Sequence, residues 1–249
     1  MSVGAIYMAY RGLTRPYVTS RDNQKLLTDD YISAGLHSLK SLRKVSDIPV
    51  TVFTDSPKIF ESYDCDIIES GPTYGDTKDK LFAYQATPYE TTLFLDCDTE
   101  VLRDPYDIID TDCEMQLCRE LFLDIKRKEW LGFHYNYNTG VFVYTQTLSM
   151  ERVWEKCIVA AESLPIGVNS GDQNIVNKQI RGPGGLCVNV KLMPNTWNVR
   201  AGIYSQVEEK NILHLHNLHN ENRELVIEEA MKWEPAVKKY LKADLACQT

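Results

Sequence analysis

The feature that most constrains the fold of this chain is a short apolar run that leads directly into two aspartates. The run is Leu-Phe-Leu at 93–95, and Asp96 and Asp98 follow it. A continuous apolar segment of this length is typical of a strand buried on both faces, as in parallel sheets. Buried carboxylates are costly unless they are paired or bind a cation. We therefore expect both aspartates at the carboxyl end of the strand, where ligands bind in open α/β sheets.

Two carboxylates at this spacing suggest a metal site. They can share one hard divalent ion, whose remaining positions are filled by water and by phosphate oxygens of a substrate. The alternative is a strand that ends in a solvated Asp-x-Asp turn, because aspartate is a common turn residue. The pattern by itself leaves both interpretations open.

Strands and helices alternate along the whole chain. The first hundred residues predict strands at 3–10, 48–54, 65–68 and immediately before Asp96, helices at 31–44 and 79–86, and a loop at 11–30. The remainder predicts strands at 114–118, 141–144, 187–192 and 212–216, helices at 149–161 and 171–179, and an amphipathic tail from residue 225. This alternation indicates an α/β fold with a nucleotide-binding half built on a parallel sheet. Repeats and low-complexity linkers are missing, which favours one domain over residues 1–249.

The composition excludes several functional classes. A net charge of -8 and the lack of a basic run argue against a nucleic-acid-binding protein. The seven cysteines form no Cys-x-x-Cys pair and show no zinc-ligand spacing, which is typical of reduced, mostly buried thiols in a cytoplasmic protein. No signal-like amino terminus and no apolar run of about 18 residues is present, so we expect neither secretion nor a transmembrane segment.

Two histidines near the end of the predicted sheet are candidate metal ligands. His214 and His216 lie on one face of a strand because side chains alternate with period two. Hydrogen-bonded histidines at a strand end are the alternative. Together with Asp96 and Asp98, a site of carboxylates and imidazole is the more economical interpretation, and its chemistry suits Mn²⁺. His219 lies beyond the alternation and is predicted to be a loop residue.

Three further features each have a structural and a functional interpretation. Asn-Thr-Gly at 138–140 is either a turn or the source of an amide, on Asn138, that contacts a sugar. Asp172 either caps the helix that begins there or lies in the site. Lys80 is either a solvated surface residue or a cation that neutralises a phosphate.

The order of the motifs resembles that of the metal-dependent GT-A glycosyltransferases, and most of all family 8, which holds glycogenin and bacterial galactosyltransferases. The resemblance spans residues 3–217, and the ordered set is more specific than any one of its short motifs. The set consists of Val-Phe-Thr-Asp at 52–55, Lys80, Leu-Phe-Leu-Asp-Cys-Asp at 93–98, Asn-Thr-Gly-Val at 138–141, Gly-Asp-Gln at 171–173 and Leu-His at 213–214.

The resemblance implies a single, Rossmann-like GT-A domain with a mixed, mainly parallel central sheet flanked by helices. Its nucleotide-binding half would cover residues 1–100, its acceptor and sugar half 101–220, and a helical tail 221–249. By the same resemblance, the metal ligands are Asp96, Asp98 and His214, with His216 as the alternative to His214. The residues implied to contact the donor nucleotide are Ala9, Tyr10, Asp55, Lys80 and Cys97, and those implied to act on the transferred sugar are Asn138, Asp172 and Gln173.

The chain departs from the family pattern in three places, one of which is the stretch 11–30, which looks like an insertion. Family members usually follow the histidine with a glycine and a Lys-Pro-Trp that reaches the diphosphate, whereas residues 216–220 here read His-Asn-Leu-His-Asn. Arg223, Lys191 and Arg200 are the candidates for that missing cation. The family's Asp-Gln-Asp reads Asp-Gln-Asn at 172–174.

The function implied by the resemblance is transfer of a sugar from a UDP-sugar to a hydroxyl of a glycan, protein or small molecule. The reaction would depend on Mn²⁺, with Mg²⁺ as the alternative, and would retain the anomeric configuration. One rival is a nucleotide-sugar-binding protein without turnover. A second rival is an aspartyl phosphohydrolase, but Glu100 occupies the position where that class has Thr or Val. A third is a nucleotidyltransferase, whose Gly-rich basic loop has only a faint counterpart at 11–15.

Overall fold

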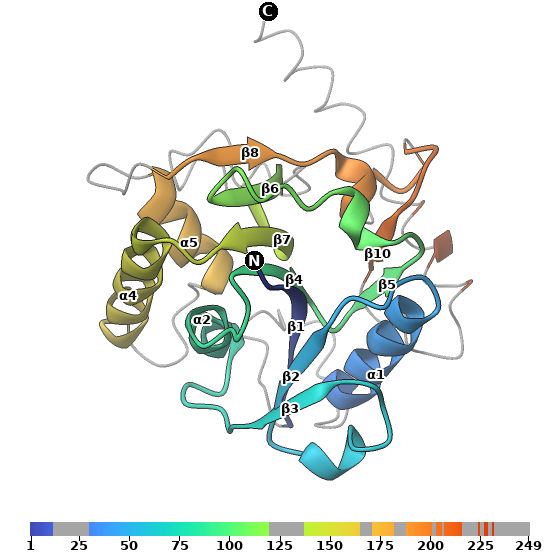
Figure 1. The fold of residues 1–249 in the computed structure, drawn as a ribbon, viewed down its shortest axis with the longest axis horizontal. Coiled ribbons are helices and arrows are strands. Elements are labelled where there is room, and N and C mark those ends of the chain that lie inside the picture. The colour runs from blue at the N-terminus through green and yellow to red at the C-terminus, as the bar shows by residue number, and fades with distance from the viewer. Residues whose placement is uncertain are drawn as a thin grey trace, which may run out of the picture.

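The computed structural model describes a mixed sheet covered by helices on both faces (Figure 1). The described residues are 1–11, 30–119, 137–164, 171–181, 188–200, 203–205, 207–215, 224, 227, 228 and 231. The predicted loop at 11–30 lies almost entirely outside this set. Also outside it lie His216, His219, Arg223 and most of the predicted tail. The extent of a single domain over 1–249 stays a prediction.

The described residues form a seven-stranded sheet in the order β3-β2-β1-β4-β7-β6-β8. Strands β3, β2, β1 and β4 are parallel neighbours, β7 runs antiparallel to both β4 and β6, and β6 is parallel to β8. The predicted mixed, mainly parallel sheet is therefore confirmed. The strands are β1 (Val3–Ala9), β2 (Val50–Thr54), β3 (Asp66–Glu69), β4 (Thr91–Leu95), β6 (Met115–Arg119), β7 (Tyr137–Thr145) and β8 (Val190–Leu192).

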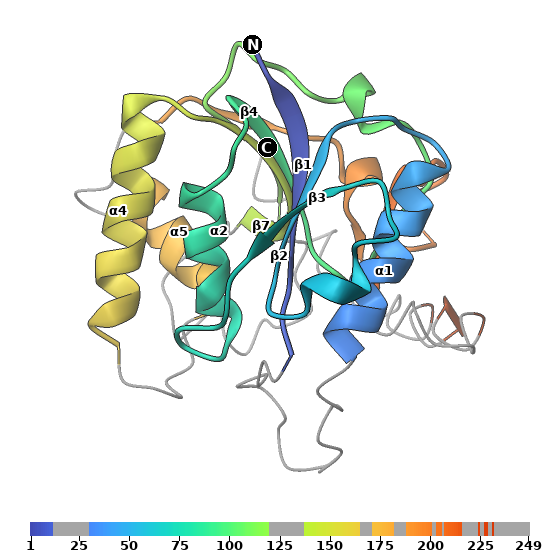
Figure 2. The same ribbon diagram turned by 60° about the horizontal axis from the view of Figure 1, so that its bottom comes forward.

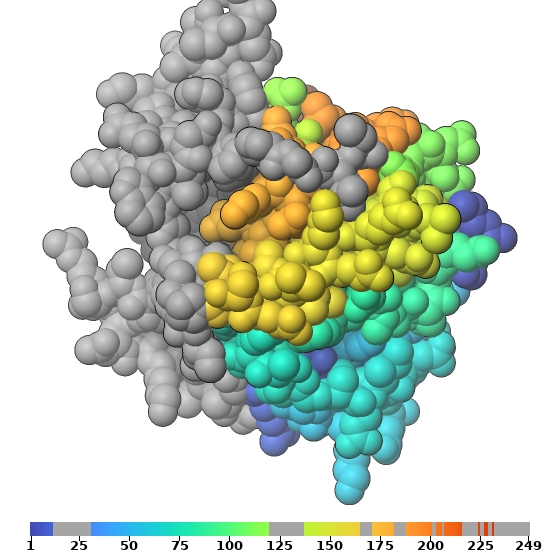
Figure 3. Space-filling model, turned by 90° about the vertical axis from the view of Figure 1, so that its left-hand side faces the viewer, coloured from blue at the N-terminus to red at the C-terminus, as the bar shows by residue number. Residues whose placement is uncertain are grey.

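Helices cover the sheet unequally. In Figure 2, α1 (Asp30–Arg43) lies on one face of the sheet, and α2 (Lys80–Gln85), α4 (Leu148–Glu162) and α5 (Asp172–Arg181) lie on the other. Figure 3 faces the side of the molecule that carries α2, α4 and α5, and it shows α4 in yellow above the teal segment that contains α2. The short helices are η1 (Pro57–Ile59), η2 (Thr77–Asp79), η3 (Pro105–Asp107) and η4 (Asn195–Trp197).

Helix α4 shows why these segments are helical. Its buried residues recur at helical spacing and turn one apolar stripe toward the sheet. They are Met150, Val153, Trp154, Cys157 and Ala161. The cap is Thr147, whose side chain accepts a hydrogen bond from the Met150 N–H at 3.2 Å, so the helix begins at Leu148, one residue before its predicted start.

A second, smaller sheet joins residues 199–214 to the segment just after β4. Its order is β5 (Thr99–Val101), β10 (Ile212–His214) and β9 (Val199–Arg200), with β10 antiparallel to β5 and parallel to β9. The predicted strand at 212–216 is thus shortened to three residues, and β9 was not predicted, because two residues show no periodicity. The small sheet carries His214 to the carboxyl end of β4.

The strand predicted at 141–144 begins earlier, at Tyr137. Asn138, Thr139 and Gly140 are part of β7, so the turn interpretation of this segment is wrong. The β6–β7 register shifts between Leu117 and Cys118. Residues 139–141 of β7 are passed over in this register, which is more than the single extra residue of a simple β-bulge.

None of the helices in the described part of the chain has the length and apolar character needed to cross a membrane. The cysteines described, at 65, 97, 113, 118 and 157, are all free thiols, and all but Cys65 are buried. This agrees with the predicted reduced thiols.

Candidate metal and donor site

Two aspartates and a histidine that are far apart in the sequence meet beyond the end of β4. Nε2 of His214 lies 3.4 Å from Oδ2 of Asp96 and 3.2 Å from Oδ1 of Asp98. One ligand atom from each of the three residues lies within 4.8 Å of the others. The side chains of Asp96 and Asp98 are only 15% and 12% exposed. The interpretation as a solvated Asp-x-Asp turn is therefore wrong.

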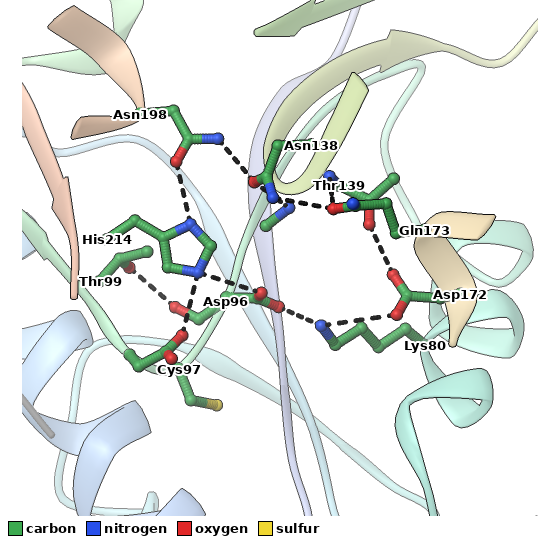
Figure 4. A network of polar contacts seen from close by, with 12 residues as sticks. Lys80, Asp96, Cys97, Thr99, Asn138, Thr139, Asp172, Gln173, Asn198 and His214 are labelled. Atoms are coloured by element: carbon green, nitrogen blue, oxygen red, sulfur yellow. Dashed lines mark hydrogen bonds and ion pairs between the residues drawn. The ribbon is translucent and has the colours of Figure 1, made fainter. Parts of the chain in front are cut away.

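Gly140 makes room for this cluster, in which the His214 ring faces Asp96 (Figure 4). Its carbonyl accepts a hydrogen bond from the Asp96 N–H at 2.7 Å, which ties β7 to the end of β4. A β-carbon on residue 140 would lie 2.7 Å from Oδ2 of Asp96 and even closer to the His214 ring. A residue with a side chain at this position would displace both groups.

The donor set fits a divalent cation. Two carboxylates and one imidazole are the mixed oxygen and nitrogen ligands that suit Mn²⁺. Burial by itself would lower the pKa of the His214 imidazole, but the negative charges of Asp98 and Asp96 outweigh it and raise that pKa. The site thus already attracts positive charge at Nε2 of His214. Neutral imidazole is the form that binds a metal ion.

Lys80, at the start of α2, faces the site. Its Nζ lies 2.5 Å from Oδ1 of Asp96 and 4.0 Å from Oδ1 of Asp172, and its side chain is only 14% exposed. Burial by itself would lower the pKa of the Lys80 ammonium, but the carboxylates of Asp172 and Asp96 outweigh it and raise that pKa. The interpretation of Lys80 as a solvated surface residue is wrong.

Asp172 does not cap α5. The carbonyl of Gly171 accepts the first helical hydrogen bond, from the Asn174 N–H at 3.0 Å. Oδ2 of Asp172 instead accepts hydrogen bonds from the Tyr84 hydroxyl at 3.0 Å and the Thr139 hydroxyl at 2.8 Å. The carboxylate is therefore held in the interior, with its other oxygen toward Lys80.

The side-chain amides of Asn138, Gln173 and Asn198 also line the site. Nδ2 of Asn138 donates to Oε1 of Gln173 at 2.8 Å, which brings together the two predicted sugar-contacting amides. Asn198, just after η4, links Asn138 to His214. Asn198 was not predicted as a site residue, because the surrounding Asn-Thr-Trp-Asn carries no pattern that sets it apart.

The residues predicted to hold the base lie at the carboxyl ends of β1 and β2. Ala9 pairs in register with Thr54, so Tyr10 and Asp55 lie side by side just beyond the strands. The Asp55 carboxylate accepts the Arg11 N–H through both oxygens, at 3.1 and 3.0 Å. The hydroxyl of Tyr10 is hydrogen-bonded to the hydroxyl of Ser70 at 2.7 Å.

Cys97 lies between the two aspartates, but its thiol points away from them into the core. The thiol donates to the Met8 carbonyl at 3.1 Å, and burial raises its pKa. Any contact of Cys97 with a nucleotide would involve its backbone.

The candidates for the missing diphosphate cation differ in position. Lys191, on the edge strand β8, pairs with Asp110 at 2.5 Å. Arg200 pairs in parallel register with His214 and so lies beside the cluster. Arg223 lies outside the described residues.

Comparisons with known proteins agree with this architecture at the level of the fold. The sequence matches no protein-family model and no curated protein. Its structure is similar to glycosyltransferase GlyE of Streptococcus pneumoniae TIGR4, with a TM-score of 0.59 and 16% identity over 98% of this chain, although it spans only 64% of the GlyE chain. It is similar to the galactosyltransferase LgtC, solved with donor and acceptor sugar analogues, with a TM-score of 0.62 and 14% identity over 94% of this chain and 99% of LgtC.

A third similar structure is the bifunctional glycosyltransferase WbbM, with a TM-score of 0.59 and 12% identity over 96% of this chain and 51% of WbbM. At sequence identities this low, the similarity supports a shared fold but not a shared substrate. The predicted fold is confirmed: this chain has the GT-A glycosyltransferase fold and resembles the glycosyltransferases of family 8.

Proposed function

We propose that this protein is a glycosyltransferase that moves a sugar from a UDP-sugar to an acceptor hydroxyl with the help of Mn²⁺. The observation that carries the proposal is the cluster of Asp96, Asp98 and His214 at the carboxyl end of β4. In open α/β sheets this edge is where ligands bind. The acceptor would be a glycan, a protein or a small molecule, and the expected location is the cytoplasm.

Asp96, Asp98 and His214 would hold the metal ion. When bound, the ion supplies Lewis-acid stabilisation of the negative charge that develops on the departing diphosphate. The ammonium of Lys80, 2.5 Å from Asp96, would donate a charge-assisted hydrogen bond to a phosphate oxygen of the same donor. Arg200, beside His214 in register, is our candidate for the second cation on the diphosphate.

Asn138, Asp172 and Gln173 would contact the transferred sugar. The Asp172 carboxylate already accepts two hydroxyl hydrogen bonds and faces Lys80. These contacts stabilise its negative charge and so weaken it as a nucleophile. We therefore favour retention of configuration by attack on the same face as the leaving diphosphate, over a covalent sugar–Asp172 intermediate.

The nucleotide base would lie at the ends of β1 and β2. The Asp55 carboxylate is fixed by the Arg11 N–H and would accept an N–H of uracil on its remaining lone pairs. Ala9 and Tyr10 would form the adjoining wall. This arrangement is the basis for naming UDP as the nucleotide.

The test is a calorimetric titration of UDP, with and without Mn²⁺, on the wild type and on Asp98→Ala. We expect binding that requires Mn²⁺ and is lost in Asp98→Ala, while Asp47→Ala, at an exposed aspartate, behaves as the wild type. Binding that ignores the metal, or no binding of UDP or other nucleoside diphosphates, would overturn the proposal.

A second assay separates an enzyme from a binding protein of the same fold. Incubation with a panel of UDP-sugars and Mn²⁺ should release UDP, by transfer to an added acceptor or by slow hydrolysis. Metal-dependent binding without release of UDP across the panel would favour the binding protein. Release of phosphate from simple phosphoesters would favour the phosphohydrolase.

A further inference from the structure

A side chain of α5 holds the start of β7, directly beside the predicted sugar contacts. The β4–β7 ladder ends at the pair Leu95–Val141, so Tyr137, at the start of β7, lies beyond the last of these pairs. Oδ1 of Asn177 accepts the Tyr137 N–H at 2.8 Å, and Nδ2 of Asn177 donates to the Tyr137 carbonyl at 2.8 Å. A residue on a neighbouring antiparallel strand makes the same two hydrogen bonds, so Asn177 acts in place of such a residue.

The same amide is also bonded to the helix that carries it. Nδ2 of Asn177 donates to the carbonyl of Gln173 at 2.8 Å. All three partners of Asn177 are backbone groups, and a backbone N–H can only donate whereas a carbonyl can only accept. The amide therefore has a single orientation, and it ties the backbone of β7 to that of α5. We call these three hydrogen bonds the Asn177 clamp.

Packing alone does not explain an asparagine at this position. Residue 177 lies inside α5 and is only 6% exposed. Asparagine is a poor helix former, and a buried polar group is costly unless it is hydrogen-bonded. Val176 and Ile180 show that apolar residues fill the other buried positions of this helix. What distinguishes Asn177 is therefore the clamp that it makes.

The clamp lies next to the two predicted sugar-contacting amides (Figure 4). Asn138 follows Tyr137 in β7, and its Nδ2 donates to Oε1 of Gln173 at 2.8 Å. The Thr139 N–H donates to the same oxygen at 3.4 Å. Asn177 thus fixes the backbone of Gln173 itself and of the residue before Asn138. A shift of α5 along β7 would break the clamp and separate the two amides.

We infer that Asn177 is a positioning residue that fixes α5 against β7 and so holds Asn138 and Gln173 at the spacing that a transferred sugar requires. The role of the sugar rests on the proposed function, whereas the clamp does not. No hydrogen bond of the clamp involves Asp96, Asp98 or His214, so its loss should affect the sugar and not the metal or the nucleotide. A misplacement of about 1 Å is enough to reduce turnover about 100-fold.

The first test needs no ligand. Hydrogen exchange followed by NMR should show a slowly exchanging Tyr137 N–H in the wild type and exchange about 10-fold faster in Asn177→Ala, as expected for the loss of one hydrogen bond. The side-chain amide signals of Asn138 and Gln173, assigned from their loss in Asn138→Ala and Gln173→Ala, should shift in Asn177→Ala. Val176→Ala, which removes a buried apolar contact of the same helix, is the matched control and should leave these signals in place.

The second test measures turnover with Mn²⁺ and UDP-glucose or UDP-galactose, whichever releases UDP. In Asn177→Ala, kcat should fall about 10- to 100-fold, while the affinity for UDP with Mn²⁺ stays within a few-fold of the wild type. Asn177→Asp keeps the shape of the side chain but has no N–H for the two carbonyls, so it should lose turnover as well although it leaves no cavity. Val176→Ala should keep kcat within a few-fold.

Three results would overturn the inference. The first is a wild-type Tyr137 N–H that exchanges as fast as an amide without a partner, which needs no variant to fold. The second is Asn138 and Gln173 signals that stay in place in Asn177→Ala or shift equally in Val176→Ala. The third is an equal loss of kcat and UDP affinity in Asn177→Ala. If the signals shift as expected but the wild type neither binds UDP with Mn²⁺ nor releases it from either sugar nucleotide, the positioning of the two amides stands and the proposed function fails.

Discussion

Gly140 and the ring of His214 compete for the same space: a β-carbon on residue 140 would lie 2.0 Å from Cε1 of His214. The metal cluster can form because residue 140 has no side chain. Glycine inside a strand is otherwise unfavourable, and it often marks a close approach of another group. Here the group that approaches is the candidate ligand itself.

The first prediction is that Gly140→Ala disables the site. The methyl group would push His214 and Asp96 apart, so we expect Mn²⁺ affinity to fall below detection and the free energy of unfolding to drop by about 1–3 kcal/mol, as for other overpacked interiors. Calorimetry with Mn²⁺ and urea unfolding measure the two effects. Gly71→Ala is the matched control, because a β-carbon there meets nothing within 4 Å. Wild-type Mn²⁺ affinity in Gly140→Ala would contradict the prediction.

The second prediction is that Lys80→Met affects the metal and the nucleotide in opposite directions. Without the ammonium of Lys80, the carboxylates of Asp96 and Asp172 lose their cation, and a bound divalent ion is no longer repelled by a neighbouring positive charge. Mn²⁺ alone should therefore bind several-fold more tightly, by about 0.5–1 kcal/mol. UDP at saturating Mn²⁺ should bind about 10- to 100-fold more weakly, because a charged hydrogen bond contributes about 1.5–3 kcal/mol. Sequential calorimetric titrations resolve the two. Lys80→Arg keeps the positive charge and is the control. Equal losses of Mn²⁺ and UDP affinity in Lys80→Met would refute the assignment of Lys80 to the phosphate of the donor.

The third prediction concerns the route of transfer. Because Oδ2 of Asp172 is held by the Tyr84 and Thr139 hydroxyls, we expect no covalent sugar adduct when the protein meets a UDP-sugar without acceptor. Intact-protein mass spectrometry tests this. Gln173→Ala should reduce turnover by a larger factor than Asp172→Asn, which keeps the shape of the side chain. An adduct that is present in the wild type and absent in Asp172→Asn would establish the covalent route instead.

The fourth prediction is a pH dependence of stability that arises at Glu114, away from the site. Burial by itself would raise the pKa of this carboxyl, but the Asn189 N–H and the hydroxyls of Thr147 and Ser149 outweigh it and lower that pKa. A folded-state pKa below the unfolded one stabilises the protein above about pH 4.3, the ordinary value, and this stabilisation is lost as the pH falls through the folded-state value.

Glu114→Gln should therefore be less stable than the wild type at pH 7, and the difference should shrink in acid. Urea unfolding at neutral and acidic pH measures this difference. Glu155→Gln, at an exposed position on α4, should follow the wild type at both pH values. A constant difference between Glu114→Gln and the wild type at all pH values would contradict the linkage.

Local patterns in the sequence determined most of the helices and strands and the position of two carboxylates of the site. The apolar run at 93–95 became the buried strand β4, because a continuous apolar run suits a strand buried on both faces. The helical spacing at 149–161 became α4, because apolar residues at this spacing lie on one face of a helix. The position of Asp96 and Asp98 followed from the end of that strand. The order of motifs then led to the GT-A fold.

Only the tertiary structure decided which distant groups meet. The approach of His214 to Asp98 depends on β10 pairing with β5, and strand pairing uses backbone hydrogen bonds that nearly every residue can make. The contacts of Asp172 with Tyr84 and of Asn198 with His214 also depend on tertiary packing, so no local pattern in the sequence predicts them. An asparagine in a short turn looks the same whether it faces solvent or holds a ligand, because its role is set by what the fold places beside it.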